Sequence, residues 1–210
     1  MKKQITVYKL KKLATESLKN GLRLHFDSIY LYRNKSYASA LQLSILALEE
    51  ISKSDWIEHY YYSSVTNTGL PDVDFEQKWL KLLYIHTKKH KAFVGWGICR
   101  QYRESFVNSL RSGEIDQLKQ MATYVGLERI NGAIDTKGRI TTPTKIKAQD
   151  AKKMISVIND YFLDSCDRKE FGNHAYDIKE KDAVLDEITC LKIKHWGHNS
   201  GLRKKPFIKR

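Results

Sequence analysis

The stretch SYASALQLSILALEEISK, residues 36–53, decides the fold class of this chain. Several of its apolar residues recur at the three- and four-residue spacing that places side chains on one face of a helix. These residues are Ala38, Leu41, Ile45 and Leu48. Ser36 precedes them and is a suitable N-cap, because its hydroxyl can accept a hydrogen bond from a free backbone N–H. We therefore expect a helix over about 36–63 whose apolar stripe faces a core.

Two adjacent carboxylates end that apolar stripe. Lys53 follows Glu49 by four residues and Glu50 by three, so its amine can reach either carboxylate on one helix surface. Two interpretations stay open for these groups. They could assist a catalytic or phosphate-binding site, or they could form a buried polar cluster with His86, since buried charges are usually paired.

The remaining pattern predicts a mainly α fold, an up-and-down bundle of four to five long helices. The expected helices span about residues 10–33, 36–63, 74–111, 115–121 and 145–166, and a last helical stretch, continuous or broken, spans about 173–195. Short strands near 124–125 and 139–141 predict a small β-hairpin insertion at about 122–143. We expect residues 1–190 to form one domain and residues 191–210 to form a basic C-terminal tail.

Composition narrows the class of protein. The chain has 210 residues, of which 41% are hydrophobic, and no apolar run is long enough to cross a bilayer, so no membrane partner is expected. No signal-peptide core follows the charged N-terminus. The three cysteines are odd in number and widely spaced, which favours reduced thiols and a cytoplasmic location. A structural zinc site is not expected, because no CxxC pair is present.

The formal charge of +13 is concentrated near both termini. Basic termini on a nearly neutral centre suit a polyanionic partner such as RNA, because each neutralised phosphate releases counterions. The alternative is that these lysines and arginines are simply solvated.

Three blocks, in order, resemble the AbiV family of bacterial abortive-infection proteins, part of the HEPN superfamily. The first is the alanine-rich segment with Glu-Glu-x-x-Lys at 49–53, and the second is His-x-x-Lys at 86–89. The third is residues 118–125 with Thr142-Pro143. The resemblance implies a HEPN-like helical bundle and anti-phage defence by growth arrest. It also implies a phage-encoded activator, a homodimer, no cofactor, and in many members ribonuclease activity.

Many HEPN ribonucleases carry an arginine followed by four to six residues and a histidine. Arg168 and His174 are similar, with five residues between them, although Lys169 stands where many members have Asn. A histidine can move the protons of RNA cleavage near neutral pH, and an arginine can hold the phosphate and offset its growing charge. Asn173 could cap a helix and place His174 in its first turn, where the helix dipole favours neutral imidazole. The alternative is a loop arginine and a capping-region histidine.

The second block adds candidates for RNA or phosphate binding. His86 and His90 have the i, i+4 spacing of two metal ligands, but neighbouring lysines such as Lys89 repel a dication, so we expect no metal. We expect instead a basic helix face that contacts phosphate or pairs with Glu49 and Glu50. Trp196, in the C-terminal segment, could stack on a base or anchor the tail on the bundle.

Two function classes follow from these patterns. The first is an abortive-infection toxin that arrests growth as a metal-independent ribonuclease using Arg168 and His174. The second is a non-catalytic binding protein that blocks the translation machinery or senses a phage protein.

Overall fold

A computed structural model describes residues 3–67, 69–95, 101–127, 129–130, 133–171 and 178–204. Among the described residues, helices account for most of the chain and the strands are short, so the predicted mainly α, HEPN-like fold is confirmed. No helix in these described ranges combines the length and apolarity that a membrane crossing requires.

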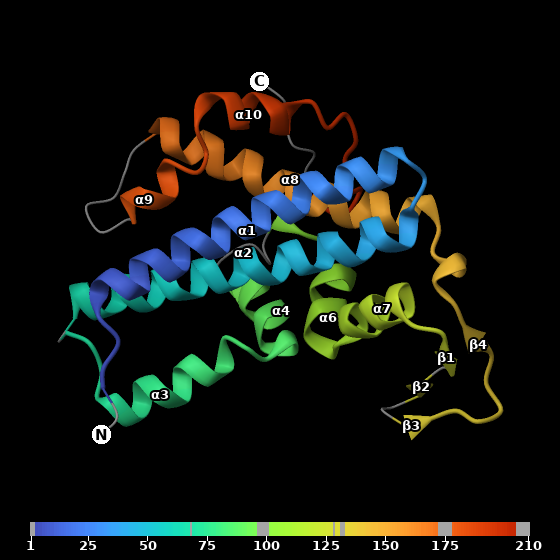
Figure 1. Cartoon of the computed structure of the whole chain (residues 1–210), viewed down its shortest axis with the longest axis horizontal. Coiled ribbons are helices and arrows are strands. Elements are labelled where there is room, and N and C mark those ends of the chain that lie inside the picture. The colour runs from blue at the N-terminus through green and yellow to red at the C-terminus, as the bar shows by residue number, and fades with distance from the viewer. Residues whose placement is uncertain are drawn as a thin grey trace.

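Two long helices, α1 (Val7–Arg33) and α2 (Tyr37–Thr66), lie side by side along the length of the molecule (Figure 1). Thr6 caps α1 by accepting a hydrogen bond from the N–H of Lys9 at 3.3 Å. Gly21 lets the two backbones approach closely, because a Cβ at this position would lie 3.0 Å from a side-chain carbon of Ile51. This glycine therefore serves helix packing rather than interrupting α1.

A third long helix, α8 (Ala148–Phe171), packs against α1 and α2 and completes the main core. The side chains at the centre of this core have almost no exposed surface. They include Leu41, Ile45, Leu48, Ile155, Ile158 and Phe162. The apolar stripe predicted for residues 36–53 therefore faces the core.

The predicted continuous helix over 74–111 is wrong. The chain instead forms α3 (Val73–Leu82), α4 (His86–Gly95) and α6 (Glu104–Ser112). Leu83, in the turn after α3, is buried with Trp79 in a second, smaller core at one end of the bundle. The chain turns at Leu83, whose side chain packs in this second core, and α4 then packs against α2.

Gly113, with a φ of 91°, separates α6 from α7 (Glu114–Thr123). The β-hairpin insertion follows and is confirmed, but its first strand lies two residues after the predicted 124–125. In it, β1 (Gly126–Leu127) pairs with β4 (Ile140–Thr141), and β2 (Arg129–Ile130) pairs with β3 (Ala133–Ile134). It projects from the bundle in Figure 1 and returns through a short 3-10 helix, η1 (Pro143–Lys145), to α8.

In its described part, the helical stretch expected over about 173–195, continuous or broken, is broken into two short helices, α9 (Lys179–Asp182) and α10 (Glu187–Lys194). The predicted boundary at residue 191 falls inside α10, which packs on α8. Trp196 is buried and its indole N–H donates to the hydroxyl of Ser156 at 2.9 Å. The anchoring role considered for Trp196 is the one the structure has.

The expectation of reduced thiols is wrong for two of the three cysteines. Cys166 on α8 and Cys190 on α10 form a disulfide. They are 24 positions apart in sequence, and only the packing of α10 on α8 brings them together. Cys99 lies outside the described residues.

Candidate functional site

The strongest concentration of functional groups surrounds the carboxylate of Glu49, which is buried in the middle of α2. Its Oε2 lies 2.5 Å from Nδ1 of His86 and 3.0 Å from Nζ of Lys89. Its Oε1 lies 2.7 Å from Nζ of Lys119 and 3.3 Å from Nε2 of His90. We call these five residues the Glu49 cluster.

Helix geometry explains how α4 supplies three of these groups. His86, Lys89 and His90 occupy positions i, i+3 and i+4, so their side chains share one face of the helix. That face packs against α2 at the level of Glu49. Lys119 arrives from α7, which also contacts α2.

The charges in the cluster stabilise ionised Glu49. Burial raises the pKa of this carboxyl, but hydrogen bonds from His90 and Lys119 and the positive charge of Lys89 outweigh burial. The net result is a pKa well below the usual range, so Glu49 is an anion at neutral pH. The carboxylate therefore compensates the buried positive charge of Lys89 and contributes to compensating that of Lys119.

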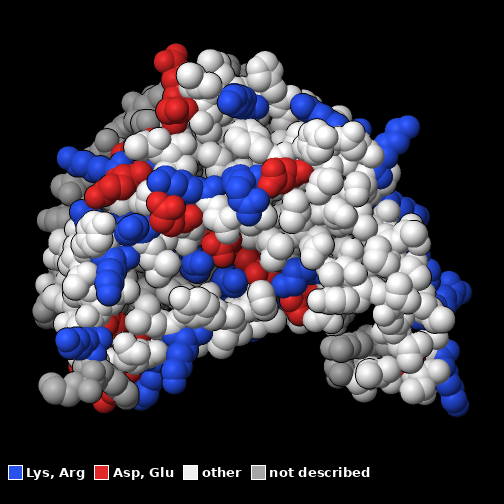
Figure 2. All heavy atoms as spheres, in the orientation of Figure 1, with Lys and Arg blue, Asp and Glu red and all other residues white. Residues whose placement is uncertain are grey.

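Glu50 and Lys53 form a separate pair beside the cluster. The Lys53 amine lies 3.0 Å from the nearer Glu50 oxygen, and both side chains are largely covered. Lys53 thus pairs with Glu50, although the sequence spacing also allows Glu49. Lys119 has a second acidic partner in Asp116, at 3.1 Å. On the face of the molecule that Figure 2 shows, acidic and basic groups are intermixed in the middle, whereas basic groups line the edge on the hairpin side.

The structure therefore joins Glu49 to His86, as the buried-cluster interpretation expects, and places Glu50 and Lys53 next to it. Sequence reasoning missed Lys119, which lies 70 positions after Glu49. No local pattern marks it, because the contact depends on how α7 packs. Within the described residues, no group of three or more His, Cys, Asp or Glu side chains is arranged to hold a metal ion.

Arg168, one of the two predicted RNA-cleaving residues, lies at the C-terminal end of α8. Arg168 and Lys169 both belong to the last turn of this helix, which ends at Phe171, five residues after the predicted end at 166. Asn173 and His174 lie outside the described residues. The meeting of Arg168 and His174 in one site stays a prediction.

Both flanks of that segment are fastened to the bundle. On one side, the disulfide at Cys166 joins α8 to α10 two residues before Arg168. On the other side, Ile178 is buried and its N–H donates to a carboxylate oxygen of Glu58 at 3.3 Å. The described residues before and after this segment are therefore fixed to the bundle, at Cys166 and at Ile178.

A second buried ionic cluster holds α9 on α2. The Lys181 amine lies 2.5 Å from Glu58 and 3.2 Å from Asp55, and the hydroxyl of Tyr161 also donates to Asp55, at 2.7 Å. Burial lowers the pKa of Lys181, but the two carboxylates more than compensate and raise it above its ordinary value. Sequence analysis did not single out these residues, because their pairing crosses more than a hundred positions.

Comparison with known protein families matches residues 9–164 to AbiV, a family of the HEPN type. The matched segment covers well over half of the chain and contains the whole Glu49 cluster, but it ends before Arg168. No curated protein and no solved structure matches the chain. With a helical bundle of the expected kind and a family match over most of its length, the chain belongs to the AbiV family of HEPN proteins.

Proposed function

We propose that this protein is an abortive-infection effector that arrests growth by cutting RNA without a metal ion, with Arg168 and His174 as the reacting pair. Membership of the AbiV family links the chain to abortive infection. Cleavage itself is the further step, and one observation carries it. Arg168 lies in the last turn of α8, and the segment after it is fastened at both flanks, by the Cys166 disulfide and by Ile178.

The chemistry needs two groups. The imidazole of His174 takes the proton of a ribose 2′-hydroxyl as that oxygen attacks the adjacent phosphorus, and a protonated imidazole returns a proton to the leaving 5′-oxygen. The guanidinium of Arg168 binds the phosphate and offsets the charge that grows on it. A homodimer would supply both protonation states from two copies of His174, one acting as base and the other as acid.

The test is incubation of the purified protein with total RNA, in buffer and in excess chelator. We expect cleavage that survives chelation and falls by at least about a hundredfold in Arg168→Ala and His174→Ala. Arg23→Ala is the matched control, because Arg23 is an exposed arginine on α1 paired only with side chains of its own helix. Full cleavage by the His174 variant would overturn the proposal.

The purified protein can be silent without its activator, so the same variants are also expressed in growing bacteria during phage infection. We expect wild-type protein to arrest growth and to leave RNA fragments after infection. Arg168→Ala and His174→Ala should abolish both effects at equal protein levels, whereas Arg23→Ala should not. Growth arrest that persists in both site variants would also overturn the proposal.

A second function has its own supporting observation. The family match contains the Glu49 cluster but stops short of Arg168. A binding protein that blocks the translation machinery, or senses a phage protein, would need the shared bundle and not the pair at residues 168 and 174. Blocked translation with intact RNA, unchanged in His174→Ala, would favour this binding function.

A further inference from the structure

A pocket of about 340 Å³ lies between the C-terminal half of α2 and the start of α3, away from the Glu49 cluster. His59 on its wall is ten residues beyond Glu49 along α2, which is a distance of about 15 Å. The volume falls in the range of small-molecule sites. The pocket is lined by Trp56, His59, Tyr60, Ser63, Ser64, Asn67, Gly69, Pro71, Phe75 and Trp79.

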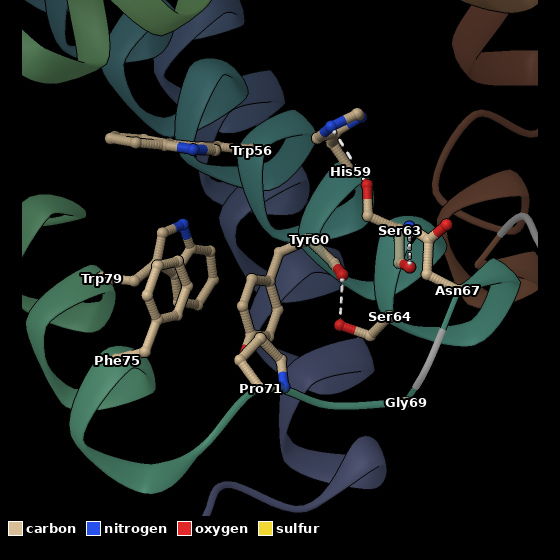
Figure 3. A pocket seen from close by; sticks show the side chains of 10 residues that line it. All are labelled: Trp56, His59, Tyr60, Ser63, Ser64, Asn67, Gly69, Pro71, Phe75 and Trp79. Carbon is tan, nitrogen blue, oxygen red and sulfur yellow. Dashed lines mark hydrogen bonds between the residues drawn. The ribbon is translucent and has the colours of Figure 1, made fainter.

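Aromatic rings form one side of this pocket (Figure 3). Tyr60 and Trp79 are stacked with ring centroids 3.9 Å apart, and Trp56 meets Trp79 edge to face at 6.4 Å. The hydroxyl of Tyr60 donates to the buried Glu76 carboxylate at 3.3 Å, which fixes the ring. Phe75 is about half exposed at the mouth. These rings are held in place before any ligand arrives, so their faces are preorganised for stacking.

Neutral polar groups form the other side (Figure 3). Nε2 of His59 and the Ser63 hydroxyl lie 3.2 Å apart, and the Asn67 amide donates to the Ser63 carbonyl at 2.7 Å. Burial lowers the pKa of His59, which favours the neutral form of its imidazole. Among the residues that the structure describes, no Lys, Arg, Asp or Glu lines the pocket, although 29% of the chain is charged.

This combination defines the ligand. A flat ring can stack against the aromatic side while its polar edge exchanges hydrogen bonds with His59 and Ser63, as proteins do when they bind an unpaired base. A phosphate would find no cation among the described lining residues, and an aliphatic ligand would leave the polar side unused. We propose that the pocket between α2 and α3 binds a free nucleobase or nucleoside, with Trp56 as the stacking surface and His59 and Ser63 as the edge-reading groups. The site does not depend on the proposed ribonuclease function.

The test is calorimetric titration of the full chain with adenosine, guanosine, cytidine, uridine and AMP. We expect at least one nucleoside to bind saturably and AMP to bind more weakly than adenosine. Trp56→Leu keeps an apolar side chain but removes the ring, and it should weaken the binding by about tenfold. Ser63→Ala should weaken it less. Tyr30→Ala is the control, because Tyr30 is an exposed aromatic residue on α1, away from the pocket.

A second measurement on the unmutated sequence guards against a misfolded variant. In protein labelled with 5-fluorotryptophan, the nucleoside should shift the ¹⁹F signals of Trp56 and Trp79 and leave that of Trp196, which is buried against α8, in place. The absence of binding by any nucleoside up to about 5 mM would overturn the proposal. So would a signal shift confined to Trp196, unchanged affinity in Trp56→Leu, or AMP that binds as tightly as adenosine.

Discussion

Replacing Glu49 by glutamine should lower the free energy of unfolding of this protein more than almost any other single change of charge. The glutamine side chain has the same size, but it removes the one negative charge that Lys89 and Lys119 share in the core. The side chains of these lysines are only 7% and 13% exposed, and that of Glu49 is 2% exposed. The new amide also presents hydrogen-bond donors to ammonium groups that can only donate.

The magnitude follows from this burial. Removing one partner of a buried ion pair typically costs 3–5 kcal/mol, because the remaining charge is left uncompensated, and we expect Glu49→Gln to cost about that much. For a chain of this length, such a loss lowers the midpoint of thermal unfolding by about 10 °C. Glu16→Gln is the matched control. Glu16 pairs with Lys19 on the surface, both side chains are more than half exposed, and the change should be barely measurable.

The assay is urea unfolding of wild-type protein, of the single variants Glu49→Gln, Glu16→Gln and Lys89→Met, and of Glu49→Gln combined with Lys89→Met, because Lys89 pairs with Glu49 whereas Lys119 also pairs with Asp116. We expect the combined variant to lose less stability than the sum of the two single changes, because the second change removes an uncompensated cation.

The low pKa of Glu49 also determines how its contribution to stability depends on pH. The carboxylate contributes its full stability above its ordinary pKa of 4.5 and loses it as the pH falls toward the lower folded value.

The stability gap between wild type and Glu49→Gln should therefore be widest above about pH 4.5 and narrow at lower pH. A loss below about 1 kcal/mol at pH 7 would refute the reasoning, since it would mean that the lysines do not depend on Glu49. Loss of growth arrest in a variant of unchanged stability would likewise make Glu49 a functional group rather than a structural one.

Three further changes have defined outcomes. Burial lowers the pKa of His25 to about 4, although the hydrogen bond with Asn159 raises it. The free energy of unfolding of wild-type protein should therefore fall by about 2 kcal/mol between pH 7.5 and 5, because the histidine takes up a proton in the unfolded chain before it does so in the folded one. Urea unfolding of His25→Gln should show a flatter dependence of this free energy on pH. Reduction of the Cys166–Cys190 disulfide should cost about 3 kcal/mol, measured as a lower unfolding midpoint in dithiothreitol, and mass spectrometry showing three free thiols in protein purified without reductant would contradict the bond. Lys181→Met should speed amide hydrogen exchange in α9, because Glu58 then loses its cation, whereas unchanged exchange would show that α9 is held by apolar contacts alone.

The sequence predicts those parts of this fold that depend on residue patterns within a short stretch of the chain. The apolar stripe of α2 has helical spacing, and the pairing of Glu49 with His86 follows from two short motifs. Lys119 could not be predicted, because it joins Glu49 through the packing of α7 on α2. The turn at Leu83 could not be predicted for the same reason. The apolar residues on either side of it continue the helical spacing, and only packing in the second core explains why α3 ends there.

The ion pairs also indicate which positively charged side chains an RNA strand can contact. Lys89 and Lys119 count toward the net charge of +13, but both are buried against Glu49 and neither is free for a phosphate. An RNA strand must instead meet exposed cations, and four of them follow the return of the hairpin into α8. These are Lys137, Arg139, Lys145 and Lys147. Because phosphate binding depends on accessible charge, the hairpin side can bind phosphates of an RNA strand, but it lies at the opposite end of α8 from Arg168, about 30 Å away, so an RNA cut at Arg168 would have to span this distance to contact both.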